Sequence, residues 1–415
     1  MPHIEEIVRK AKEKAYQETD SEPDPSLTTA IQWPVTCEIG PGLEDAITCE
    51  SKVGYVNGPK GWLIYCGLDT FDLSQKSSFE ETAYLLLYGK LPTLKEFEDF
   101  KAKLSKYRAL PSEIEPYLER LPIRENHAMT GLRTLVSILG MLDPDADDTS
   151  VEAQTEVVIK MIARFPTVVG AISRIRAGEK PLAPDPSQSL AADFIRMMTG
   201  KQPSPDDARV MDICLILHAD HGINASTFAS MVVNSSMSDM YSSLVAGIGS
   251  LKGPLHGGAN EAVLHTLEEI GDPAKVDGWY EESRAKKRKV MGFGHRVYKA
   301  YDPRARVLHP LAELLSQRDP EIRKLYDIAE KLEKLVVGDL GAKKGVFPNV
   351  DFYSGIVYAA MGIDKAMFTP IFAVSRVTGW GARTIEYLKN NRIFRPQDVY
   401  VGPLRVEYVP IQERG

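Results

Sequence analysis

Residues 78–92 read Ser-Phe-Glu-Glu-Thr-Ala-Tyr-Leu-Leu-Leu-Tyr-Gly-Lys-Leu-Pro, and this stretch shows the helical pattern that much of the chain follows. Ser78 can cap a helix, and Glu81 follows three residues later, as in a capping box. Gly89 and Pro92 come in the order expected where a helix ends. The stretch therefore predicts a helix with a defined start and a defined end.

Similar helix-length units continue after residue 92. Prolines divide the following sequence into segments such as 151–164 and 190–199, each long enough for a helix. We find no internal repeat and no sustained heptad, so the sequence predicts an all-α fold rather than a fibrous one. The dividing prolines are Pro92, Pro111, Pro122, Pro144, Pro166, Pro181, Pro184 and Pro203.

The sequence before residue 78 is of two kinds. Residues 4–17 place apolar side chains at helical spacing, which predicts a short amphipathic helix followed by a Ser/Asp/Pro-rich link through Pro25. In residues 53–67, Asn57-Gly58 lies between two β-prone runs, the usual signal for a tight hairpin. We expect this one short β-hairpin to be the only notable sheet.

The composition is that of a globular protein. The chain has 415 residues, of which 43% are hydrophobic and 26% charged, enough for about two or three domains. No apolar run reaches the ~18 residues of a membrane-spanning helix, so we expect no membrane segment. The formal net charge of -7 gives no general attraction for nucleic acid or an anionic membrane.

The four cysteines are scattered and form no C-x-x-C pair, which excludes a disulfide framework and favours a reducing compartment. The first 20 residues have no apolar core for a signal peptide, and their glutamates argue against a transit peptide. We therefore expect a cytoplasmic location.

Four of the eight histidines lie in three short stretches. These are His-Ala-Asp-His-Gly-Ile-Asn-Ala-Ser-Thr at 218–227, Gly-Pro-Leu-His-Gly-Gly-Ala-Asn-Glu at 253–261 and Met-Gly-Phe-Gly-His-Arg-Val-Tyr-Lys at 291–299, which Asp-Pro-Arg follows at 302–304. Glycines beside an imidazole allow backbone to approach a small ligand closely. The stretches therefore predict a ligand site.

The residue types suit proton transfer on an anionic carbon acid. A histidine side chain ordinarily titrates near neutral pH, Asp351 stands beside aromatic residues, and there is no nucleophilic serine or cysteine motif. Arg304 and Arg376 are candidates to hold carboxylates in a planar bidentate fork. These residue types therefore favour a dicarboxylate ligand.

In their order along the chain, the three stretches and Pro-Asn-Val-Asp-Phe-Tyr at 348–353 resemble the citrate synthase family over roughly residues 40–405. The resemblance implies a large helical domain from 39–255 and 363–415, a smaller helical domain inserted at 256–362, and an N-terminal arm at 1–38. It also implies an active site in the cleft between the domains, closed by hinge motion.

The resemblance further implies condensation of acetyl-CoA with oxaloacetate to citrate in a homodimer, with no metal and no cofactor beyond the substrates. Asp351 would be the base, His256 would stabilise the enol and His295 would protonate the oxaloacetate carbonyl. His221, Arg304 and Arg376 would bind oxaloacetate together with His256 and His295, and Arg395 would serve the partner's site. The acetyl-CoA residues would be Val290, Met291, Gly292, Phe293, Gly294 and Lys299, with Gly292 and Gly294 exposing backbone to the adenine.

Several alternatives remain open at this point. Propionyl-CoA could replace acetyl-CoA and give 2-methylcitrate, since one methylene changes binding by only ~1 to 3 kcal/mol. The same site could cleave citrate in the reverse direction, or the protein could bind CoA or a dicarboxylate without catalysis. His218 and His221, three apart on an expected helix, could bind a metal with Asp351, although a buried structural role for His218 is the simpler interpretation.

Two basic features also have two interpretations each. The run Arg-Ala-Lys-Lys-Arg-Lys at 284–289 is either a solvated face or a site for cofactor phosphates. Arg376 is either a carboxylate ligand or one half of a structural ion pair.

Overall fold

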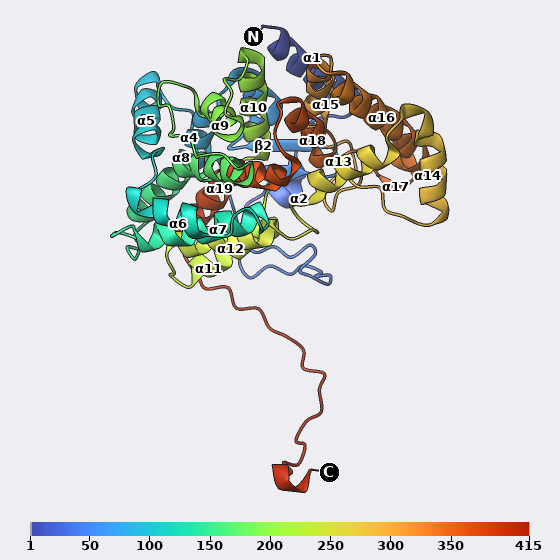
Figure 1. Cartoon of the computed structure of the whole chain (residues 1–415). Coiled ribbons are helices and arrows are strands. Elements are labelled where there is room, and N and C mark those ends of the chain that lie inside the picture. The colour runs from blue at the N-terminus through green and yellow to red at the C-terminus, as the bar shows by residue number, and fades with distance from the viewer. Residues whose placement is uncertain (1, 415) are drawn as a thin grey trace.

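Helices form nearly all of the regular structure in the computed structural model, which describes residues 2–414 (Figure 1). The all-α expectation is confirmed. The first helices are α1 (Pro2–Glu18), α2 (Pro25–Thr28), α3 (Thr70–Lys76), α4 (Phe79–Tyr88), α5 (Leu94–Tyr107), α6 (Glu115–Arg120), α7 (Ala128–Met141), α8 (Val151–Arg176), α9 (Leu190–Thr199) and α10 (Pro205–His218). The later ones are α11 (Ala225–Ser235), α12 (Met240–Leu251), α13 (Ala259–Ile270), α14 (Val276–Ala285), α15 (Pro303–Ser316), α16 (Pro320–Val336), α17 (Ala342–Lys344), α18 (Val350–Ala360) and α19 (Phe368–Leu388).

Helix α4 follows the pattern that its sequence predicts. Ser78 caps it by accepting a hydrogen bond from the Glu81 amide at 3.2 Å. Gly89 ends it in the left-handed conformation, at φ 73°, where a residue without a side chain meets least steric resistance. The expected helix at 190–199 is also present, as α9.

The expected break at Pro166 is wrong. Helix α8 continues through this proline to Arg176 and buries side chains on both sides of it. Two long helical halves packed against α19 and α9 offset the cost of an interior proline, which is about 3 kcal/mol.

The expected hairpin is present, but its turn is longer and a third strand extends it. Strands β1 (Gly54–Asn57), β2 (Trp62–Tyr65) and β3 (Leu68–Asp69) form an antiparallel sheet in the order β1-β2-β3. Asn57 is paired with Trp62 inside the ladder, so the loop has four residues, 58–61. The Asn57 side chain accepts a hydrogen bond from the Lys60 amide at 3.1 Å and closes this loop.

Helix α19 forms the centre of the molecule. It is buried along most of its length and packs against α8, α11, α10, α12 and α4. A second group of helices packs around α18, which contacts α15, α13 and α16. After α19 the chain continues as an extended tail that leaves the body of the molecule (Figure 1).

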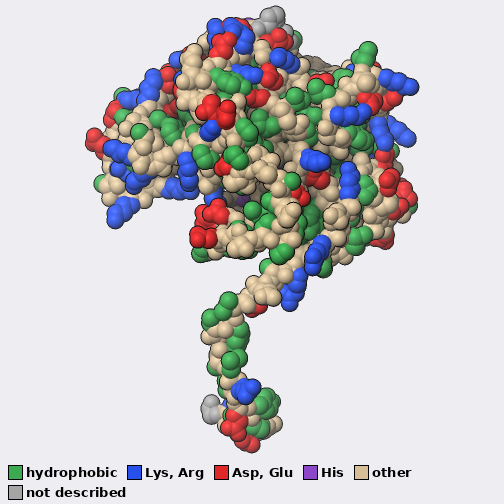
Figure 2. All heavy atoms as spheres, turned by 180° about the vertical axis from the view of Figure 1, so that it is seen from behind, with side chains coloured by type: hydrophobic (Ala, Val, Ile, Leu, Met, Phe, Trp, Pro, Cys, Tyr) green, Lys and Arg blue, Asp and Glu red, His purple; other side chains and the backbone are tan. Residues whose placement is uncertain are grey.

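The far face of the molecule carries mixed charge (Figure 2). Lysine and arginine side chains alternate there with aspartate and glutamate, and the tail shows apolar side chains to solvent. Within residues 2–414, no helix has both the length and the apolar character needed to cross a membrane.

Candidate active site

His295 lies in the loop before α15, against His221 from the loop after α10. The two imidazole centroids are 5.1 Å apart, and the Tyr298 hydroxyl lies 3.1 Å from His221 Nε2. Nδ1 of His295 accepts hydrogen bonds from the amides of Val297 and Tyr298, at 3.0 and 3.1 Å. A neutral His295 therefore carries its proton on Nε2, which is free to donate to a ligand.

His256 lies at the end of the loop that leads to α13. Its Nε2 is 3.3 Å from the Ser226 amide, which donates to it, and 2.7 Å from the Ser226 hydroxyl. The oxygen of that hydroxyl accepts a hydrogen bond from the indole of Trp380, at 3.0 Å. With Nε2 accepting, the neutral ring has its proton on Nδ1. The network thus fixes both the orientation of His256 and the atom that donates.

Burial keeps both imidazoles neutral. It lowers the pKa of His256 and of His295 to about 4, with nearby Arg376 adding to the effect at His256. Both side chains are therefore uncharged hydrogen-bond donors at neutral pH.

Asp351 lies in the first turn of α18, with Asn349 as the N-cap. Asp351 is only 8% exposed, and its Oδ1 has no hydrogen-bond partner among the described residues. Burial raises the pKa of Asp351 to about 7, and the positive charge of Arg304 opposes this rise. A carboxylate with this pKa can accept a proton near neutral pH.

Hydrogen bonds join the loop that carries His295 to the segment just before α18, the helix that carries Asp351. The Gly294 amide donates to the Phe347 carbonyl and the Asn349 amide to the Gly292 carbonyl, both at 2.9 Å. The Asn349 side chain also donates to the Gly294 carbonyl, at 3.1 Å. The cap of α18 thus sets the position of both catalytic candidates.

Two buried arginines lie within electrostatic reach of these groups. Arg304 and Arg376 are 2% and 1% exposed, and the charges of both act on Asp351 and on His221. Arg304 forms a bidentate ion pair with Asp302, at 3.0 and 2.7 Å. Asp302 therefore belongs to the site, although sequence reasoning missed it.

Arg376 makes no ion pair in the described structure. Its Nε donates to the His218 carbonyl at 2.7 Å, and one terminal nitrogen is buried without a partner. Burial lowers the pKa of Arg376 to about 10. A buried guanidinium with an unused donor is suited to an anionic ligand rather than to the structural ion pair considered above.

His218 is buried, and its Nδ1 lies 2.6 Å from the Cys214 carbonyl. The expected structural role of this histidine is confirmed. Helix α10 ends at His218, so the expectation that His218 and His221 share a helix is wrong. His218, His221 and Asp351 are not arranged to hold a metal ion, and within residues 2–414 no other set of three or more histidine, cysteine, aspartate or glutamate side chains is so arranged.

The expected acetyl-CoA segment, residues 290–294, precedes His295 and is hydrogen-bonded to Phe347 and Asn349, just before α18. Gly292 and Gly294 have φ of 78° and 79°. A side chain at Gly292 would meet Val263 and Phe352 at 2.6 and 2.7 Å, whereas the space beside Gly294 is open. The Gly292 carbonyl and both the amide and the carbonyl of Gly294 are already hydrogen-bonded, so at Gly294 it is the open space beside the Cα, and not a free backbone group, that a ligand could use. Lys299 is exposed.

The structure does not bring Arg395 to the other candidates. It lies in the exposed tail, where its guanidinium donates to the Pro396 carbonyl at 2.8 Å. In the basic run, Arg284, Lys286 and Arg288 pair with Asp339, Glu282 and Glu269.

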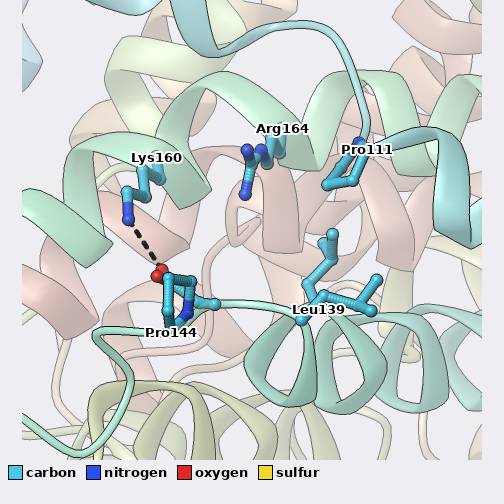
Figure 3. A pocket seen from close by; sticks show the side chains of 7 residues that line it. Pro111, Leu139, Pro144, Lys160 and Arg164 are labelled. Carbon is cyan, nitrogen blue, oxygen red and sulfur yellow. Dashed lines mark hydrogen bonds and ion pairs between the residues drawn. The ribbon is translucent and has the colours of Figure 1, made fainter.

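A cavity of about 160 Å³ between α7 and α8 contains none of the candidate site residues (Figure 3). Lys160 and Asp143 form an ion pair of 2.7 Å at its edge. The other lining residues are Pro111, Leu139, Leu142, Pro144 and Arg164.

Comparison with known proteins shows the family of the chain. The family model described as citrate synthase, C-terminal domain, matches residues 42–397. The chain belongs to the citrate synthase family. A citrate synthase from Deinococcus radiodurans is 46% identical over 91% of this chain and 99% of its own length. A citrate synthase from Saccharolobus solfataricus is 43% identical, with coverage of 91% and 99%.

Solved citrate synthase structures show the same fold. The Thermoplasma acidophilum enzyme, solved as a ternary complex with carboxymethyl coenzyme A and oxaloacetate, superposes with a TM-score of 0.86 at 38% identity, over 91% of this chain and 100% of that chain. The Thermotoga maritima citrate synthase has a TM-score of 0.82 at 42% identity, with the same coverage.

Proposed function

We propose that the chain condenses acetyl-CoA with oxaloacetate and hydrolyses the resulting citryl-CoA to citrate and CoA. The observation that carries this proposal is the combination of one buried carboxylate with a pKa of about 7 and two neutral imidazoles with defined donor atoms. Enolisation needs a base and an oxygen-directed donor at the same time, and Asp351 and His256 meet these two needs.

Asp351 removes a proton from the methyl group of acetyl-CoA. As negative charge develops on the thioester oxygen, Nδ1–H of His256 donates to that oxygen and stabilises the enol. The Ser226 and Trp380 hydrogen bonds keep this ring from rotating. A neutral imidazole suits this role. It donates to the thioester oxygen as the enol forms, and it carries no positive charge that would bind a free anion beforehand.

The enol carbon then attacks the keto carbon of oxaloacetate, and Nε2–H of His295 gives its proton to the keto oxygen. Arg376, with its unused donor, binds one carboxylate of oxaloacetate. His221 and Arg304 line the same region, and Asp302 fixes the Arg304 guanidinium. Water hydrolyses the thioester of citryl-CoA and releases CoA. Positioned acids and bases contribute about 10² to 10⁴-fold each, and the orientation of two substrates supplies more.

We also propose that the chain is divided into two domains. Residues 39–255 with 363–415 form the large domain, and residues 256–362 form the small one, with the site between them. The chain acts as a homodimer in which Arg395 reaches the partner's site. Its exposure in a tail with many apolar side chains supports this arrangement.

Release of free thiol tests the function directly. The purified protein mixed with acetyl-CoA and oxaloacetate should release CoA thiol, and neither substrate alone should do so. Release no faster than the background would reject the proposal. The ratio of kcat/KM for acetyl-CoA and propionyl-CoA, measured in the same assay, distinguishes citrate formation from 2-methylcitrate formation.

A further inference from the structure

Helix α1 lies outside the residues that the family model matches, yet it is firmly packed onto the molecule. Ile4 and Val8 are fully buried, and Ala15 is 1% exposed. The helix contacts both α3 and α15 and lies beside α15 at one edge of the molecule (Figure 1). In the proposed division, α3 belongs to the large domain and α15 to the small one. Helix α1 therefore spans the two.

Polar contacts fix α1 on the large-domain side. Lys12 forms an ion pair of 2.6 Å with Asp72 of α3. The Tyr16 ring packs edge-on against Trp62 of the sheet, with centroids 4.6 Å apart. Beyond the helix, Asp20 pairs with Lys60 in the hairpin loop.

A further ion pair fixes α1 to α15. Glu18, the last residue of α1, pairs with Arg306, whose side chain is 8% exposed. Arg306 also lies over the Tyr301 ring, 4.6 Å from its centroid. Arg304, two residues earlier in the same first turn, faces the active site instead and pairs with Asp302. The turn that presents Arg304 to the site is thus held from outside by α1.

We propose that α1 is an interdomain strap that positions α15, and with it Arg304, for oxaloacetate binding. This inference rests on the proposed function and domain division. Asp351, His221 and Arg304 are 8%, 7% and 2% exposed in the present arrangement, so the strap holds the domains where the site is shielded. If the domains open, α15 moves away from α3, and α1 must lose contact with one of them. Docking of α1 and binding of oxaloacetate therefore strengthen each other.

Hydrogen exchange in the intact protein tests this coupling without any substitution. Saturating oxaloacetate should slow amide exchange in residues 2–18 as well as in residues 218–226 and 302–306. Protection of the two site segments without any change in α1 would overturn the strap and leave the proposed function standing. Absence of protection in all three segments would show that oxaloacetate does not bind, and would overturn both.

Substitutions measure the size of the effect. Glu18→Gln should raise the KM for oxaloacetate about twofold to fivefold, as expected for one partly exposed ion pair, with kcat at or above the parent value. Glu13→Gln is the matched control, since among residues 2–414 Glu13 pairs only with Arg9 of the same helix, and it should leave KM unchanged. The double exchange Glu18→Arg with Arg306→Glu should restore KM.

Deletion of residues 2–24 should raise KM further than Glu18→Gln does. An unchanged KM in Glu18→Gln and in the deleted protein would contradict the proposal. If the deleted protein fails to fold, the Glu18 variants and the exchange measurement still decide the question. A fall in kcat with unchanged KM would also contradict it, because a loss of positioning acts first on substrate binding.

Discussion

Burial of Asp351 suits this side chain to its proposed role as the base. At the first turn of α18, the helix N-terminus and Arg304 both favour a charged carboxylate. Desolvation is the larger effect, and it raises the pKa of Asp351 to about 7. An unpaired, buried carboxylate is costly to keep charged. The same burial that makes Asp351 a stronger base therefore makes the folded protein less stable.

The activity should follow the ionisation of Asp351. Below a pH of about 7 the carboxyl group is protonated and cannot act as a base, whereas His256 and His295 stay neutral down to about pH 4. We expect kcat/KM for acetyl-CoA to rise with pH through about 7 and then level off. A pH-rate profile checks this, and a profile that is flat from pH 5 to 8 would contradict it.

Asp351→Asn should abolish turnover and stabilise the protein. In the native state Asp351 stays protonated up to a pH of about 7, while in the unfolded state it ionises near 3.8. The parent therefore loses stability as pH rises between these values. We expect the variant to be more stable by about 1–4 kcal/mol at pH 8, with a much smaller difference at pH 4. Urea unfolding at both pH values measures this, and a less stable variant at pH 8 would contradict it.

The segment 292–294 and the cap of α18 act as one structural unit. Their hydrogen bonds hold the loop of His295 beside the helix of Asp351. Gly292 packs against Phe352, the residue next to Asp351. Any side chain at Gly292 must displace Phe352. The packing of this segment therefore affects the position of Asp351, the proposed base.

Gly292→Ala and Gly294→Ala form a matched pair that tests this packing. Both positions have φ near +78°, which costs an alanine about 1 kcal/mol or more. At Gly292 the new methyl group also meets Phe352 and Val263, whereas at Gly294 it meets open space. We expect Gly292→Ala to lower the free energy of unfolding by about 1–3 kcal/mol more than Gly294→Ala does. If urea unfolding shows that the two variants lose the same free energy of unfolding, Gly292 is not tightly packed against Phe352 and Val263.

Hydrophobic periodicity and helix-end residues were sufficient to predict those helices whose ends depend on nearby residues alone. Ser78 and Gly89 bound α4 as expected, because a cap depends on residues within one turn. Pro166 failed as a boundary, because the packing that keeps α8 continuous comes from α9 and α19. Asn57 failed as a turn residue, because its pairing with Trp62 is set by the sheet.

The site could be predicted only in part from the sequence. The glycine-flanked histidines, Asp351 and the arginines stand out as residue types, and the family resemblance gave them roles. The contacts that orient them join distant residues, such as Trp380 with Ser226, which no local pattern reveals. Asp302 carried a local signal, since an aspartate before Pro303 is typical of a helix cap, but its ion pair with Arg304 depends on the fold.

Mixing of two inactive variants tests whether active sites are shared between two chains. Arg395→Ala and His256→Ala should each be nearly inactive alone. In a mixed dimer, one site combines an intact His256 with an intact Arg395 from the partner. Random reassociation of equal amounts should therefore recover about a quarter of the parent activity. No recovery, although mass measurement shows mixed dimers, would place Arg395 outside the partner's site.

A crystal structure with oxaloacetate and a non-reacting acetyl-CoA analogue would show where Asp351, His256 and His295 lie relative to the reacting atoms. We expect the Asp351 carboxylate to lie about 3–3.5 Å from the carbon that replaces the acetyl methyl. We also expect Nδ1 of His256 to lie about 2.7–3.1 Å from the position of the thioester oxygen, and Nε2 of His295 to lie equally close to the keto oxygen. If these three groups instead point into separate pockets, or contact neither ligand, the proposed mechanism is wrong.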